Sequence, residues 1–265
     1  MRLPSLLSAF RRPAPAEGLV YAPASEASPM AAAHAGAAIR IEGRGAPWIV
    51  VFDRIETITV AKWPGRLWRV RVAEAASGRD QAKAGGPPRA DAGYVRAVAV
   101  RVVEELPAAM LFGAHGEAVA RVIETASRLD RREAERLAAA RHADAAGALD
   151  RLWRGWTTAR GLVIPAGGGF DGVLKLGAAR PASPVGDGLA VLHSALFARA
   201  TAIDGEAATH EDEDGAWLND PWRCAGAALA DAALALGAPE HASERDRAAL
   251  LHAFDGDGGT DHRAR

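Results

Sequence analysis

Residues 57–72 read TITVAKWPGRLWRVRV, two runs of β-branched and aromatic residues on either side of a Pro-Gly turn. Such a pattern is typical of a β-hairpin. A three-residue loop over 64–66 would pair Val60 with Val70 and Ile58 with Val72, so that apolar side chains share one face. The stretch therefore predicts two paired strands, 57–62 and 67–72, with one face on a core.

The other face of this predicted hairpin would carry Thr59, Arg69 and Arg71, with Trp63 near its edge. Basic side chains beside an aromatic ring can bind an acidic protein or a nucleic-acid strand. The same stripe is also what a solvated sheet face looks like in an arginine-rich chain. Arg69, Arg71 and Trp63 are our candidate binding residues on this face.

Two further segments upstream have strand composition, AIRIE at 38–42 and WIVVF at 48–52. With the hairpin they predict a small antiparallel β-meander within residues 18–75. Residues 76–93 are rich in Gly, Pro and Ala and predict a linker. We expect residues 1–17 to form a flexible N-terminus.

Residues 94–254 predict a mainly α-helical domain, followed by a flexible tail at 255–265. Segment 94–106 fits a helix with its charges on one side, although its valines leave a strand open. Asp130 and Glu133 have the spacing of a capping box. Segment 162–176 predicts an inserted β-hairpin with a glycine-rich turn. The chain is thus predicted to be an α+β protein.

Charge is divided along the chain although the total is balanced, with 32 basic and 33 acidic side chains in 265 residues. Residues 1–101 have a net charge of +7 and the remainder −8, and 204–220 contain seven acidic residues but no Lys or Arg. This division favours an electrostatic partner, or contact between the two halves. It argues against a globally basic nucleic-acid binder.

The single cysteine, Cys224, cannot form an internal disulfide, which fits a reducing, cytoplasmic location. We expect it to be a structural residue rather than a reactive thiol. Arginine greatly outnumbers lysine, as in a bacterial-like GC-rich coding sequence, so a single Arg is weak evidence for anion recognition. No apolar stretch is long enough to span a bilayer, and we expect no membrane association.

Candidate chemistry rests on histidines and carboxylates. His115 lies in a turn flanked by Gly113 and Gly116 at an expected helix start, and His193 lies on the apolar stripe of an expected helix. Both are candidate catalytic residues as well as ordinary structural ones. Carboxylate oxygens could bind Mg²⁺ or Ca²⁺ in the acidic segment. The candidate metal ligands are His210, Asp212, Asp214 and Asp220. The commoner meaning of such a run is an acidic surface loop, with Trp217 as a candidate binding residue beside it.

The sequence leaves two main functional hypotheses of different classes and a third, weaker one. The leading hypothesis is a cytoplasmic accessory or adaptor protein that binds another protein through the arginine stripe or the acidic segment. The alternative is a divalent-metal-dependent hydrolase that uses His and carboxylate side chains of the helical domain. Binding of nucleic acid on the sheet face is a third, weaker hypothesis.

Overall fold

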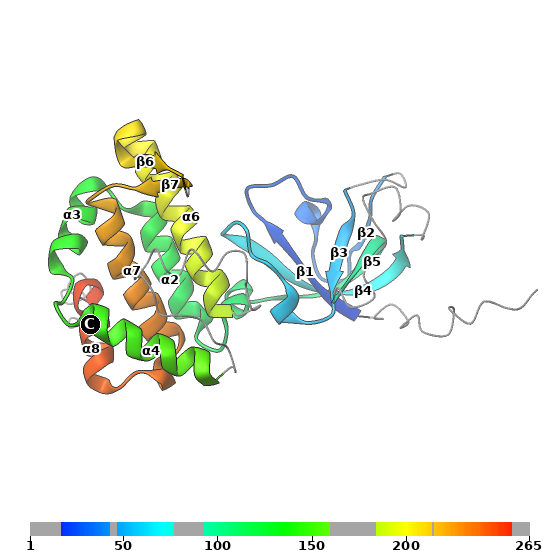
Figure 1. The fold of residues 1–265 in the computed structure, drawn as a ribbon. Helices are drawn as coiled ribbons and strands as arrows, with labels where there is room; N and C mark the ends of the chain where they lie inside the picture. Colours follow the sequence, from blue (N-terminus) through cyan, green and yellow to red (C-terminus); the bar gives the residue numbers. More distant parts are fainter. Residues whose placement is uncertain (1–16, 43–46, 77–92, 160–183, 214, 256–265) are drawn as a thin grey trace, which may run out of the picture. The chain divides into compact units, whose positions relative to one another are not determined.

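The computed structural model describes residues 17–42, 47–76, 93–159, 184–213 and 215–255 (Figure 1). Its contacts divide into two compact units, which are treated separately below. The sheet unit comprises Met1–Thr59 and Trp63–Ala108, and the helical unit comprises Val60–Lys62 and Ala109–Arg265. The predicted α+β class, with a small antiparallel sheet, is confirmed.

The sheet unit contains five antiparallel strands: β1 (Glu17–Pro23), β2 (Ala38–Arg40), β3 (Ile49–Phe52), β4 (Gly65–Ala75) and β5 (Tyr94–Leu106). β1 pairs with β3 and β4, and β5 pairs with the same two strands, so the ladder closes on itself. β2 also pairs with β5, at Ala99–Arg101, which follow the β5 residues that pair with β3. A short 3-10 turn, η2 (Pro29–Ala32), and another, η3 (Ile55–Thr57), lie in the connections.

Closure requires a close approach between β1 and β3, and Gly18 provides it. A Cβ atom at this position would lie 2.5 Å from the carbonyl oxygen of Phe52. Any larger residue would push the two strands apart, because real Cβ atoms do not approach backbone oxygens so closely. The interior enclosed by the strands is filled by buried residues that include Val51, Trp68 and Val70.

The prediction of a strand over 57–62, paired with 67–72, is wrong. Residues 58–61 have no regular structure, and β4 pairs with β1 instead, matching Val70 with Gly18. Ile58 and Val60 are nevertheless buried, at 2% and 1% exposure. Their alternation correctly marked buried side chains, but alternation does not specify a ladder partner.

The prediction of a helix over 94–106 is also wrong, because this segment is strand β5. Ala97, Val98, Ala99 and Val100 are all buried. A strand that is covered on both sides loses its period-2 pattern and cannot be told from a buried helix by periodicity. The alternative that its valines left open is the correct one.

The helical unit is built around α7 (Trp222–Gly237), which is buried over most of its surface. α2 (Gly116–Arg128), α3 (Arg131–Ala140), α4 (Ala145–Ala159), α6 (Pro184–Asp204) and α8 (Glu244–Asp255) all contact it (Figure 1). α7 is rich in alanine, and small side chains allow neighbouring helices to approach closely around it. The remaining short elements are η4 (Ala108–Phe112), η6 (Gly205–Ala208) and η7 (Pro239–His241).

The predicted capping box of α3 is confirmed. The side chain of Asp130 accepts from the backbone N–H of Glu133 at 2.8 Å, and the Glu133 carboxylate accepts from the N–H of Asp130 at 2.7 Å. The predicted hairpin at 162–176 lies outside the described residues. A different hairpin forms in the acidic segment, from β6 (Thr209–Asp212) and β7 (Gly215–Leu218).

Candidate functional site

A row of outward-facing side chains crosses the closed sheet, and the strand register fixes its order. Tyr94 of β5 stands opposite Phe52 of β3, Phe52 opposite Leu19 of β1, and Leu19 opposite Arg69 of β4. Arg69 in turn stands opposite Glu104 of β5. The rings of Phe52 and Tyr94 are 6.0 Å apart. Leu19, Phe52 and Tyr94 are partly exposed, whereas the neighbouring Val20, Val51 and Val70 fill the interior.

The predicted arginine stripe exists, but its charges are matched by carboxylates. Arg69 lies 3.2 Å from Glu104, and Arg71 lies 2.5 Å from Glu17. All four side chains are about half exposed, at 44–59%. Arg69 and Arg71 therefore form part of a mixed-charge surface. Trp63 precedes β4 and is partly buried.

We define the β1 face as Glu17, Leu19, Tyr21, Phe52, Arg69 and Arg71, six outward-facing residues on β1 and its two neighbouring strands. Arg71 and Glu17 provide a charged end, and Leu19, Phe52 and Tyr21 an apolar end. The ring of Tyr21 covers Gly65 of β4, and burial raises the pKa of its hydroxyl. In the β1 face, two predicted binding residues, Arg69 and Arg71, adjoin partly exposed apolar side chains.

The sheet unit does not carry the positive charge that the first 101 residues have as a whole. The described residues from 17 to 106 contain eight basic and eight acidic side chains. Most of the basic excess belongs to 1–16, 43–46 and 77–92, which lie outside the described residues. In the helical unit, the described residues 204–213 and 215–220 contain six acidic side chains and no Lys or Arg.

Within the β6–β7 hairpin, the candidate ligands bind other side chains. His210 Nδ1 and Asn219 Oδ1 are 2.7 Å apart, and the Trp217 indole donates to Asp212 Oδ1 at 2.7 Å. Asp220 accepts from Cys224, and Arg223 lies 3.0 Å away. Asp214 lies outside the described residues.

No group of three or more His, Cys, Asp or Glu side chains is arranged to hold a metal ion among the residues that the structure describes. The two candidate catalytic histidines belong to different segments of the helical unit. His115 precedes α2 and is exposed, and its side chain does not cap the helix. His193 lies in α6, with its ring 5.9 Å from that of Phe197.

Cys224 has the environment of a structural thiol. Burial raises its pKa, and the hydrogen bond to Asp220 raises it further. A raised pKa keeps the sulfur protonated and weakly nucleophilic at neutral pH.

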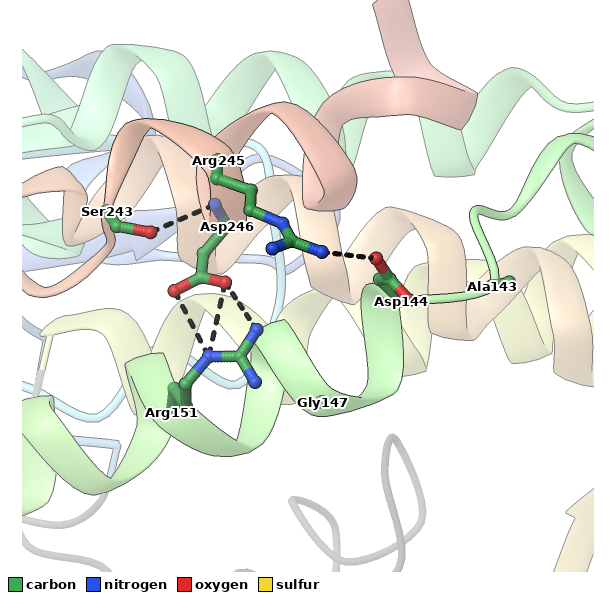
Figure 2. A pocket seen from close by; sticks show the side chains of 7 residues that line it. All are labelled: Ala143, Asp144, Gly147, Arg151, Ser243, Arg245 and Asp246. Atoms are coloured by element: carbon green, nitrogen blue, oxygen red, sulfur yellow. Dashed lines mark hydrogen bonds and ion pairs between the residues drawn. The ribbon is translucent and has the colours of Figure 1, made fainter.

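A pocket of about 570 Å³ lies between the first half of α4 and the start of α8 (Figure 2). Arg151 donates to Asp246 from Nε, 3.2 Å from each carboxylate oxygen, and from Nη2 at 2.5 Å. Arg245 donates to Asp144 at 3.2 Å. Sequence reasoning missed this pocket, because its two walls are separated by about a hundred residues. The one local signal is Gly147 within a helix.

No protein-family model, curated protein or solved structure matches the chain. None of the helices in the described ranges is long and apolar enough to cross a membrane.

Proposed function

We propose that the protein is an accessory protein that binds another protein through the β1 face. The observation that supports this function is the row Phe52–Leu19–Arg69, in which register places two partly exposed apolar side chains beside an arginine. Protein interfaces combine an apolar centre with a polar rim, and they are enriched in aromatic residues and Arg.

The charge on the β1 face limits the class of molecule that can be its partner. Because Arg69 is paired with the adjoining Glu104 and Arg71 with Glu17, the β1 face and Glu104 together have no net positive charge. A nucleic acid would gain little from it, since binding to phosphates depends on unneutralised Lys and Arg. The partner we propose is a folded protein whose apolar patch is flanked by charges of both signs.

The hydrolase alternative is not favoured by any arrangement in the described residues. His115, His193 and His210 lie on three separate elements, and no metal-binding cluster of three or more groups joins the described His and carboxylate side chains. The β6–β7 hairpin is a second charged surface, but no row of apolar side chains like Leu19 and Phe52 adjoins it in the described residues.

The test begins with a partner captured on the full chain from native lysate, identified by mass spectrometry and then purified. We expect the purified partner to bind the wild-type chain directly, and Leu19→Ser and Arg69→Ala to weaken binding at least tenfold. The matched control is Arg40→Ala, which removes another exposed arginine that is ion-paired to a carboxylate, Glu74, in the same sheet unit.

Two outcomes would overturn the proposal. One is a chain that elutes alone from lysate at both low and high salt. The other is a purified partner that binds Leu19→Ser, Arg69→Ala and Arg40→Ala equally well, which would place the interface elsewhere.

A further inference from the structure

The pocket between α4 and α8 contains two guanidinium groups, and it belongs to the helical unit, apart from the β1 face. Its lining residues are Ala143, Asp144, Gly147, Arg151, Ser243, Arg245 and Asp246. A volume of about 570 Å³ is within the range of small-molecule sites. The pocket can therefore serve a function beyond the proposed protein binding.

Arg151 is held in one orientation by Asp246, whose side chain is only 11% exposed. Ser243 fixes the start of α8 by accepting from the Asp246 N–H at 3.1 Å. The Asp246 carboxylate accepts hydrogen bonds from Nε and Nη2 of Arg151. Nη1 makes no hydrogen bond to any described residue and lies on the side of Gly147 (Figure 2).

Arg245 contributes the second set of donors. Its Nη2 binds Asp144, whereas its Nε and Nη1 make no hydrogen bond within the described parts of the chain. A guanidinium carries five N–H donors in a planar fork, which matches the oxygens of carboxylate and phosphate groups. The lining thus offers donors that its own aspartates do not use.

Gly147 is the third observation. A glycine inside a helix is less favourable than an alanine at the same position. Packing does not require it here, because a Cβ atom would meet only Nη1 of Arg151, at 3.4 Å. The absence of a Cβ atom at Gly147 instead leaves space directly beside Nη1 of Arg151.

We propose that this pocket binds a small oxyanion, a phosphate or carboxylate group, through the unused donors of Arg151 and Arg245. Asp144 and Asp246 balance the charge of the two arginines, so we expect a dissociation constant in the millimolar range for the isolated anion. A larger ligand that carries such a group would gain affinity from the rest of the pocket.

The first experiment measures thermal unfolding of the full chain at pH 7 in sodium phosphate, in sodium succinate and in sodium chloride of matched ionic strength. We expect a saturable rise in Tm with phosphate or succinate, and none with chloride. The anion that saturates at the lower concentration identifies the source of the oxyanion. A Tm that responds equally to all three salts, or to none, overturns the proposal.

The second experiment separates binding from folding with two glycine variants of α4. Gly147→Ala should raise Tm without ligand and weaken anion binding at least threefold. Gly155→Ala is the matched control, since its Cβ would lie outside the pocket, 3.6 Å from His241, and it should leave binding unchanged. Arg245→Gln removes an 86% exposed side chain and should weaken binding about tenfold. Unchanged binding in both Gly147→Ala and Arg245→Gln would refute the site.

Discussion

Asp231 lies in the middle of α7 with only 1% of its side chain exposed, and Arg141, which follows α3, donates to it from Nε at 2.7 Å. A second donor of Arg141, Nη2, lies 3.3 Å from the other oxygen. Burial raises the pKa of Asp231, while Arg141 opposes the rise. A charge in this position is tolerable because it has a partner, and removal of the partner would leave it buried alone.

Arg141→Ala should therefore lower the free energy of unfolding by about 3 kcal/mol at pH 7, because it leaves a buried carboxylate uncompensated. A raised folded-state pKa means that the native state binds a proton more readily than the unfolded state, so this loss should shrink as the pH falls through that pKa. Urea unfolding at several pH values above 4 measures both effects.

The matched control for that prediction is Arg40→Ala, which breaks an ion pair with side chains 63% and 51% exposed. Its loss should stay below about 1 kcal/mol, because exposed pairs contribute little. Equal losses in the two variants would show that Asp231 is not buried in solution.

The pKa of Asp246 is shifted in the opposite direction from that of Asp231, and it gives a further prediction. The hydrogen bonds from Arg151, and secondarily the one with Ser243, hold the pKa of Asp246 below its usual value of 3.8. A depressed pKa contributes stability that is present above the ordinary value and is lost as the pH falls through the folded-state pKa. The stability difference between wild type and Asp246→Asn should be full at pH 7 and should disappear in strong acid. A difference that stays constant with pH would contradict the ion pair.

The capping box of α3 can be tested by Asp130→Ala, which removes the acceptor for the Glu133 N–H. We expect a loss of about 1 kcal/mol in chemical denaturation. Asp130→Ser keeps a side-chain acceptor and should recover most of that loss. If alanine and serine behave alike, the cap does not contribute to stability.

Gly116, the first residue of α2, should not tolerate a side chain. A Cβ atom there would lie 1.8 Å from the carbonyl oxygen of Ala109. Gly116→Ala should destabilise the protein by about 1–3 kcal/mol through overpacking. Gly155→Ala, where the nearest heavy atom would be 3.6 Å away, should instead stabilise it by about 0.5–1 kcal/mol. Differential scanning calorimetry of the two variants gives the comparison.

Local patterns in the sequence predicted local structure well. The Arg and Val alternation of β4 placed Arg69 and Arg71 on the outside and Val70 inside, and the spacing of Asp130 and Glu133 predicted the start of α3. Each of these features depends on residues within one turn or one strand, so sequence alone contains the information.

Features that depend on distant residues could not be predicted in the same way. β4 has two ladder partners, and both lie outside the predicted hairpin, so the alternation of 57–62 suggested a pairing that does not form. Glu17 and Glu104, which neutralise the arginine stripe, come from the opposite ends of the sheet unit's sequence. The Arg151–Asp246 pair joins residues 95 positions apart. Charge counted along the chain therefore misjudged the charge of the folded surface.

Closure of the sheet also determines how its backbone opens to solvent. β1, β3, β4 and β5 each have a ladder partner on both sides among the described strands, whereas β2 pairs only with β5. The closed strands should therefore lose their hydrogen bonds together, as one cooperative unit, and β2 can separate without them. In native-state hydrogen exchange, the amides of β2 would then report local fraying, and those of the other four strands would report unfolding of the whole sheet unit.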